Sequence, residues 1–241
     1  MAQWWDADGA FAPLLQMSAA RGAFLREACC RHFGARDASA ALPLEGLRAL
    51  DVGCGGGLLA EPLSRLGCTV TAVDAAAEGV GTAAAHAAAS ADERVRGVEF
   101  IASTAEELVA QGRRFDLVCS LEVIEHVADP QEFVRTLTKL VVPGGALALS
   151  TINRTPRAYA LAIGAAEHAL GLVPVGTHEW RKFVSPEELA AMLARAGAEV
   201  RELAGMRFDP VLSRWVLSDD TAVNYIALAR LSGGVQDAPA R

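Results

Sequence analysis

The 241-residue chain lacks any uninterrupted apolar run of the roughly 18 residues that a membrane-spanning helix needs. Positive charge is also scarce, because 22 lysines and arginines stand against 29 acidic residues, for a net charge of −7. This balance argues against a general nucleic-acid binder, which normally presents a basic face. The five cysteines are an odd number without framework spacing, which is typical of reduced thiols in an intracellular protein. The opening MAQWWDADGAF is acidic and aromatic, unlike a signal or transit peptide.

Strand-like and helix-like patterns alternate along a chain that is 52% apolar. Strand patterns fall at 47–53, 68–74, 98–103, within 114–124 and at 143–152; helix patterns fall at 14–33, 57–67, an Ala-rich stretch ending near residue 90, and 129–141. This alternation predicts an α/β, Rossmann-like fold with a mainly parallel sheet and helices on both faces. Ligands of such sheets bind beyond the carboxyl ends of the strands. We expect one domain over 1–231, with a helical cover over 1–46 and a flexible tail over 232–241.

A glycine cluster follows the first strand pattern, in the segment LDVGCGGG at 50–57. Such a turn lets the backbone approach a ligand closely, with helix N–H groups facing it. The dinucleotide fingerprint fails here, because the position of its third glycine is Leu58. The pattern D-x-G-x-G-x-G does match, and it resembles the first motif of class I methyltransferases, which bind S-adenosylmethionine. The alternative is a glycine-rich turn without a ligand. The residues of the pattern are Asp51, Gly53, Gly55 and Gly57.

Two polar residues follow the next two strand patterns. Asp74 ends the second strand, where an acidic side chain can accept hydrogen bonds from both ribose hydroxyls of a nucleoside. Its alternative role is to cap a turn. Thr104 follows the third strand, near the place where this class of methyltransferase usually contacts adenine.

Three ionisable residues, Glu122, Glu125 and His126, lie in the segment LEVIEHVADP at 121–130, just after the fourth strand pattern. If this segment turns helical, the three side chains share one helix face. Two carboxylates and an imidazole can coordinate a divalent ion, for which oxygen ligands favour Mg²⁺, whereas histidine also suits Mn²⁺ or Zn²⁺. The same residues can instead act directly as acid and base. The third reading is a helix start with acids favoured by the dipole and a packed histidine.

Nearly the whole chain resembles the O-methyltransferases of ubiquinone biosynthesis, which methylate catechols and demethylubiquinols. The similar segments are 4–21, 50–61, 121–130, 143–154, 176–189 and 223–226. The glycine motif alone indicates only the methyltransferase superfamily. The opening Trp-Trp-Asp and the Gly-Thr-His at 176–178 are the segments that indicate this particular family. The chain departs from the family in a longer segment at 35–46 and in having few residues before Trp4. The resemblance implies a class I methyltransferase fold with a seven-stranded sheet.

The resemblance also implies roles for individual residues. It makes Arg21, Gly53, Asp74 and Leu121 contacts of S-adenosylmethionine. It makes Glu122, Glu125 and His126 the catalytic and metal-binding residues, with Mg²⁺ as the expected ion. It implies a polyprenylated phenol or quinol as the substrate, and other ubiquinone-biosynthesis enzymes as possible partners.

The segment 155–183 is apolar between 158 and 173, with Arg157 before that stretch and Arg181 and Lys182 after it. Too short to span a bilayer, it suits an insertion or lid that lies in the membrane interface or covers a greasy tail. An ordinary core helix with a lid is the alternative. The resemblance implies peripheral membrane association, on the matrix face of the mitochondrial inner membrane in a eukaryote and in the cytoplasm of a bacterium. His178 is a residue that can reach the substrate or act as a cap.

These features predict S-adenosylmethionine-dependent methylation of a phenolic or catechol hydroxyl on a polyprenylated ubiquinone precursor. The protein would position the reactants and stabilise the oxyanion during an in-line displacement. A methyltransferase for a soluble phenol and a non-catalytic scaffold that binds S-adenosylmethionine are the alternatives. The missing third glycine disfavours a nicotinamide dehydrogenase.

Overall fold

The computed structural model describes residues 4–6, 9, 11–34, 37–161, 179–209, 211 and 214–232. Most of the insertion expected over 155–183, including His178, and nearly all of the expected tail lie outside these residues. Within them, no helix is both long enough and apolar enough to cross a membrane.

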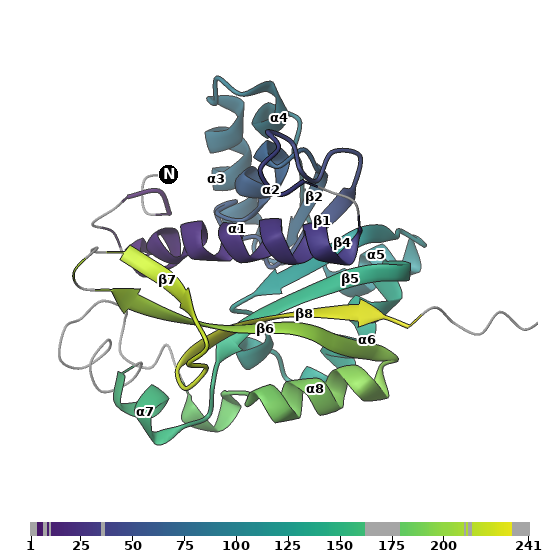
Figure 1. Cartoon of the computed structure of the whole chain (residues 1–241). Coiled ribbons are helices and arrows are strands. Elements are labelled where there is room, and N and C mark those ends of the chain that lie inside the picture. The colour runs from purple at the N-terminus through teal and green to yellow at the C-terminus, as the bar shows by residue number, and fades with distance from the viewer. Residues whose placement is uncertain are drawn as a thin grey trace, which may run out of the picture.

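Five parallel strands form one half of the sheet, as the alternating pattern predicts. They are β1 (Arg48–Val52), β2 (Thr69–Asp74), β3 (Glu99–Ala102), β4 (Phe115–Leu121) and β5 (Val141–Ile152). The order across the sheet is β3-β2-β1-β4-β5-β8-β6-β7. The strand order reverses between β1 and β4, and such a switch point opens a crevice at the carboxyl ends of the strands. These ends lie on the left of Figure 1, on the same side as the N-terminal segment and α7 (Pro156–Ala158).

The other half of the sheet is antiparallel and gives eight strands in the described residues, where the resemblance implies seven. β8 (Asn224–Leu231) pairs with β5 and with β6 (Ala198–Asp209). The extra strand is β7 (Arg214–Ser218), which pairs with the end of β6 at the sheet edge. It forms because β6 extends past its last partner on β8, leaving backbone groups that a hairpin can satisfy. The fold class is confirmed and the strand number is corrected.

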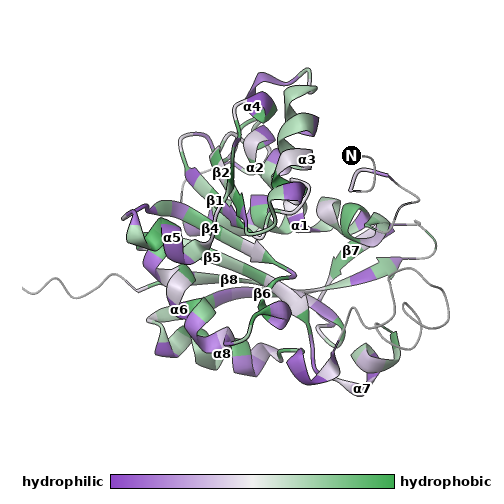
Figure 2. Ribbon diagram, turned by 180° about the vertical axis from the view of Figure 1, so that it is seen from behind, coloured by the Kyte–Doolittle hydropathy of each residue, from purple (hydrophilic) through white to green (hydrophobic). Residues whose placement is uncertain are grey.

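Helices cover both faces of the sheet (Figures 1 and 2). One face carries α1 (Ala12–His32), α2 (Ala60–Arg65) and α3 (Ala77–Ala88), with the short α4 (Glu93–Arg96) packed beside the last two. The other face carries α5 (Ala105–Ala110), α6 (Pro130–Leu140) and α8 (Pro186–Arg195). Successive strand residues therefore enter opposite cores: Ala49 packs with the α1 side and Leu50 with the α6 side. Burial of both faces explains why the central strands are mostly apolar instead of alternating between apolar and polar residues.

The start of α6 follows directly from its sequence. Asp129 is the N-cap, and one of its carboxylate oxygens accepts a hydrogen bond from the N–H of Glu132 at 3.0 Å. Pro130 occupies the first turn, where its missing N–H costs nothing. This helix start fixes the far end of the segment 121–129, which connects β4 to α6 and contains the three ionisable residues.

Candidate functional site

The glycine loop after β1 needs glycine at two positions for steric reasons. Gly53 and Gly55 have φ angles of +78° and +49°, which side chains rarely adopt. A Cβ on Gly53 would lie 2.4 Å from a methyl group of Val123, and one on Gly55 would lie 2.5 Å from the ring of Trp4. The loop therefore presents bare backbone at the carboxyl end of β1.

Asp74, at the end of β2, is bonded to this loop. Its Oδ2 accepts a hydrogen bond from the N–H of Gly55 at 2.9 Å, and its Oδ1 accepts one from the N–H of Ala76 at 2.8 Å. A carboxylate has about four acceptor sites, so both oxygens can still receive hydroxyl groups of a ligand. The residue thus caps a turn and faces a cavity at the same time.

A cavity of about 820 Å³, the first cavity, lies over the ends of β1, β2 and β4. Its volume suits a ligand of cofactor size. Six of the residues singled out from the sequence line it: Gly53, Gly55, Asp74, Thr104, Glu122 and His126. Sequence reasoning missed its apolar wall, which includes Phe11, Val123 and Phe133. Trp4 also lines this cavity, and its ring stacks on Phe11 with 3.7 Å between ring centroids.

Four other residues expected to bind the cofactor lie behind the wall of the first cavity. Among the described residues that line it, Arg21, Asp51, Gly57 and Leu121 do not appear. Gly57 packs close to Ala83, and Leu121 packs against the core on the α1 side. Thr104 does line the cavity, but its hydroxyl also caps α5 by accepting a hydrogen bond from the Glu107 N–H.

Asp51 is a fully buried acid beneath the glycine loop. Its Oδ2 has no hydrogen-bond partner among the described residues. Burial raises the pKa of this carboxyl to about 7, and the nearby charge of Asp74 adds to the rise. The carboxyl group is therefore partly protonated at neutral pH, and its backbone hydrogen bond is with Ala60 of α2.

Glu122 adopts a left-handed backbone conformation with φ of +57°, the only residue besides glycine to do so in the part of the chain that the structure describes. Its N–H donates to the carbonyl of Ser150 on β5, so it still follows the sheet. The helical turn over 122–126 is therefore wrong for Glu122, and only Ile124–His126 forms a 3-10 turn. The three ionisable side chains consequently do not share one helix face.

The carboxylate of Glu122 is bound by two donors. Nη2 of Arg21, on α1, and Oγ of Ser150 each lie 2.8 Å from its Oε1. Arg21 is itself buried, and its Nε has no partner within the described residues. This ion pair joins the N-terminal helix to the end of β4, and it is the structural reason for a buried arginine at position 21.

Glu125 points away from the first cavity. Its Oε2 accepts a hydrogen bond from the Thr151 hydroxyl at 2.9 Å, and only 4% of the residue is exposed. Burial raises the pKa of Glu125 above its usual value, and the neighbouring charge of Glu122 raises it further. This shift favours the protonated form of Glu125.

A second cavity of about 750 Å³ begins where the first one ends. It is lined by Glu125, by the α6 and α8 helices, and by the basic side chains of Arg154, Arg181 and Lys182. His126 and Val127 line both cavities. His126 is exposed, and because it lines both cavities it lies at the boundary between them.

The arrangement of these side chains does not fit a metal ion. Across residues 4–161 and 179–232, as far as they are described, no three His, Cys, Asp or Glu side chains come together as ligands. The guanidinium of Arg21 already supplies a positive charge at Glu122, where a cation would bind. We therefore assign no chemical step to an ion.

A sheet of this order, with a glycine loop and an acid over the switch point, is the architecture of a methyltransferase. The family model described as "Methyltransferase domain" matches residues 21–203. Solved structures agree at the level of fold. The magnesium protoporphyrin IX methyltransferase ChlM of Synechocystis, with bound SAH, superposes with a TM-score of 0.64 at 21% identity, over 92% of this chain and 85% of that one. CcbJ of Streptomyces caelestis gives 0.61 at 19% identity, over 89% and 96%.

Comparison with curated relatives shows which family of methyltransferases the chain belongs to. The mitochondrial ubiquinone biosynthesis O-methyltransferase of Arabidopsis thaliana is 53% identical over 93% of this chain and 69% of its own length. Its counterpart in Parvibaculum lavamentivorans is 45% identical over 95% and 88%. The chain belongs to the family of ubiquinone biosynthesis O-methyltransferases, and the resemblance stated from its sequence is confirmed.

Proposed function

We propose that this protein transfers the methyl group of S-adenosylmethionine to a phenolic hydroxyl of a polyprenylated ubiquinone precursor. Family membership supports the reaction type. The first cavity supports the donor, because it combines bare backbone at Gly53 and Gly55 with the carboxylate of Asp74, which can accept the ribose hydroxyls. A related fold, that of ChlM, was solved with SAH bound.

The observation that carries the proposal is the position of His126 between the two cavities. With the donor in the first cavity, a phenol entering from the second would meet the methyl group beside this imidazole. The phenol O–H gives its proton to His126 as the oxygen forms a bond to the methyl carbon. The carbon–sulfur bond breaks, the sulfonium becomes the neutral thioether of S-adenosylhomocysteine, and His126 later loses the proton to water.

A methyl-transfer assay on a short-chain demethylubiquinol tests the proposal, with the product measured by mass spectrometry. Because general base catalysis contributes about 10²-fold or more, His126→Asn should lower turnover by at least about 100-fold. Binding of S-adenosylhomocysteine, measured by calorimetry, should change little. His32→Asn is the control, since His32 contacts the Gly144 carbonyl near the start of β5, away from the two cavities.

The same assay separates the rival functions. A scaffold would bind S-adenosylhomocysteine but form no product with any phenol. A methyltransferase for soluble phenols would turn over catechol as well as the prenylated quinol. The Mg²⁺ that the resemblance implies at Glu122, Glu125 and His126 is not part of this proposal, because these side chains do not come together as ligands in the described structure. Repeating the assay with a chelator should therefore leave turnover unchanged, and a loss that added Mg²⁺ restores would contradict this expectation.

We extend the proposal to peripheral membrane contact through the segment that contains α7 and residues 179–183. Tyr159, Leu161 and Trp180 are large apolar side chains that are 51%, 46% and 38% exposed, and the rings of Tyr159 and Trp180 meet edge to face. Arg181 and Lys182 follow at once and also line the second cavity. Exposed aromatic and basic side chains at one site suit the boundary between lipid headgroups and acyl chains.

A further inference from the structure

The N-terminal segment is hydrogen-bonded to the glycine loop through Trp5. Nε1 of Trp5 donates a hydrogen bond to the carbonyl of Gly56 at 3.0 Å. The indole ring stacks flat on the imidazole of His86 in α3, with ring centroids 3.9 Å apart and an angle of 4° between the planes. His86 thus supports the residue that holds the loop.

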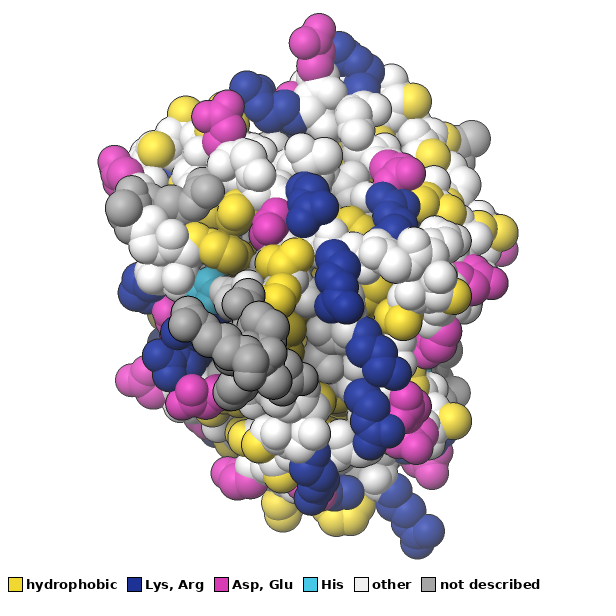
Figure 3. Space-filling view, turned by 90° about the vertical axis from the view of Figure 1, so that its right-hand side faces the viewer, with side chains coloured by type: hydrophobic (Ala, Val, Ile, Leu, Met, Phe, Trp, Pro, Cys, Tyr) yellow, Lys and Arg dark blue, Asp and Glu magenta, His cyan; other side chains and the backbone are white. Residues whose placement is uncertain are grey.

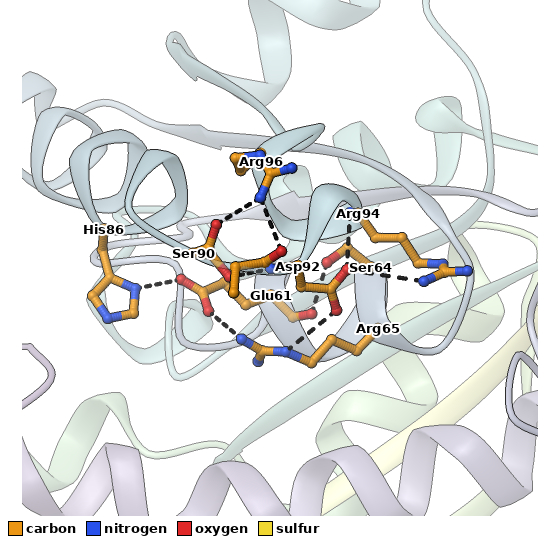
Figure 4. A network of polar contacts seen from close by, with 9 residues as sticks. Glu61, Ser64, Arg65, His86, Ser90, Asp92, Arg94 and Arg96 are labelled. Carbon is orange, nitrogen blue, oxygen red and sulfur yellow. Dashed lines mark hydrogen bonds and ion pairs between the residues drawn. The ribbon is translucent and has the colours of Figure 1, made fainter.

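The orientation of His86 is set by the buried acid Glu61 (Figure 4). Its Nδ1 lies 2.6 Å from Oε1 of Glu61, and Nη2 of Arg65 lies 2.9 Å from Oε2 of the same carboxylate. Glu61 has no exposed surface. A buried carboxylate is costly unless it is paired, so this site must keep both partners in place.

The contacts form one chain from the interior to the loop of the first cavity. Glu61 lies in the first turn of α2, the helix that follows the glycine loop, and His86 belongs to α3. Trp5 then connects His86 back to Gly56. The adjacent Trp4 lines the first cavity and contacts Gly55 and Gly56. Ordering of Trp4 and Trp5 is therefore linked to the shape of the loop.

We infer that His86 is a positioning residue for donor binding. Glu61 fixes the plane of the imidazole, the imidazole fixes Trp5, and Trp5 fixes the Gly56 carbonyl in the loop that receives the donor. This inference deepens the proposed function and rests on it in one respect, that the first cavity binds S-adenosylmethionine. His86 touches neither reactant and acts through Trp5.

The test uses His86→Ala, which removes the stacking surface, and His86→Phe, which keeps an aromatic face without the hydrogen bond. Arg96→Ala is the matched control, because Arg96 belongs to the same group of polar residues, but within the described residues its side chain bonds only the carbonyls of Ser90 and Ala91 and the side chain of Glu93. Affinity for S-adenosylhomocysteine is measured by calorimetry, and Trp5 order by tryptophan fluorescence. Thermal melting confirms that each variant is folded at the assay temperature.

His86→Ala should weaken binding by about tenfold, the scale of one aromatic stack plus the hydrogen bond that depends on it. It should raise the KM for the donor by a similar factor and leave kcat at saturating donor nearly unchanged. His86→Phe should recover most of the affinity, and Arg96→Ala should match the wild type. Wild-type affinity in His86→Ala, or equal losses in His86→Ala and Arg96→Ala, would overturn the inference alone. Failure of the wild type to bind would instead overturn the donor assignment.

Discussion

At the scale of single residues, the site contains a carboxyl group in surroundings that disfavour its charged form and a residue in an unfavourable backbone conformation. Asp51 is buried with one oxygen unpartnered in the described structure, and Glu122 holds a left-handed backbone. Such features cost free energy and persist only where the surrounding structure compels them. Here both lie next to the first cavity: Asp51 under the glycine loop and Glu122 at the end of β4.

Asp51 should make the stability of the protein depend on pH. Its pKa is about 7 in the folded state, against 3.8 for an ordinary aspartate. Between these two pH values the folded protein therefore keeps a proton that the unfolded chain has lost. The free energy of unfolding should therefore fall as pH rises from about 4 to 7, by up to about 4 kcal/mol for this group. Asp51→Asn removes the titration, so urea melts should show the variant gaining on the wild type across this window. Parallel curves for the two proteins would contradict the prediction.

The partners of single residues are what the sequence predicts least well. The sequence predicts that Asp74, Glu122 and His126 lie at one sheet edge, because the carboxyl ends of parallel strands meet at the same edge. That Arg21 contacts Glu122 does not follow from spacing, since 101 residues separate them. The stack of Trp5 on His86 is equally nonlocal. Contacts of this kind depend on how the N-terminal segment and the helices pack against the rest of the fold, and no local sequence pattern encodes that packing.

At the scale of elements, local signals decided which predictions succeeded. The start of α6 was predicted correctly, because an N-cap aspartate followed by proline determines a helix start within two residues. The turn at Glu122 was predicted wrongly, since its backbone is bonded across to Ser150 on β5. The β6–β7 hairpin was not predicted, and it exists because β6 outruns β8.

Thr104 allows a test of whether one residue both caps a helix and contributes to ligand binding. Its hydroxyl caps α5 in a capping box with Glu107, and Ser185 makes the equivalent box with Glu188 at α8. Thr104→Ala and Ser185→Ala should each lose about 1 kcal/mol of stability, the usual value of such a cap. Only Thr104→Ala should also weaken S-adenosylhomocysteine binding, because Thr104 lines the first cavity. Equal affinities in the two variants would show that Thr104 acts as a cap alone.

At the scale of the whole molecule, the two ends of the sheet differ in chemistry. Basic side chains run down the face at the amino ends of the parallel strands (Figure 3), yet Arg48 and Arg113 near that end pair with Asp116 and Glu99. The carboxyl ends carry both cavities, and beyond β5 lie the exposed apolar side chains of 159–161. Apolar exposure and substrate access therefore coincide at one end.

Because the exposed apolar side chains and the cavities lie at the same end of the sheet, we predict that this end contacts the membrane. Cosedimentation with vesicles containing anionic lipid should decrease when Trp180→Ser removes an exposed ring, and decrease more when Lys182→Glu also reverses a charge. Each basic residue near an anionic surface contributes about 1 kcal/mol, so the charge reversal should cost at least about fivefold in partitioning, and the loss should shrink at high salt. Arg48→Glu, at the opposite end of the sheet, is the control and should bind as the wild type does. Equal losses of binding in Arg48→Glu and Lys182→Glu would contradict the prediction. The membrane would then contact the amino ends of the strands or bind the protein through charge alone. The polyprenylated substrate would have to reach the second cavity by another route.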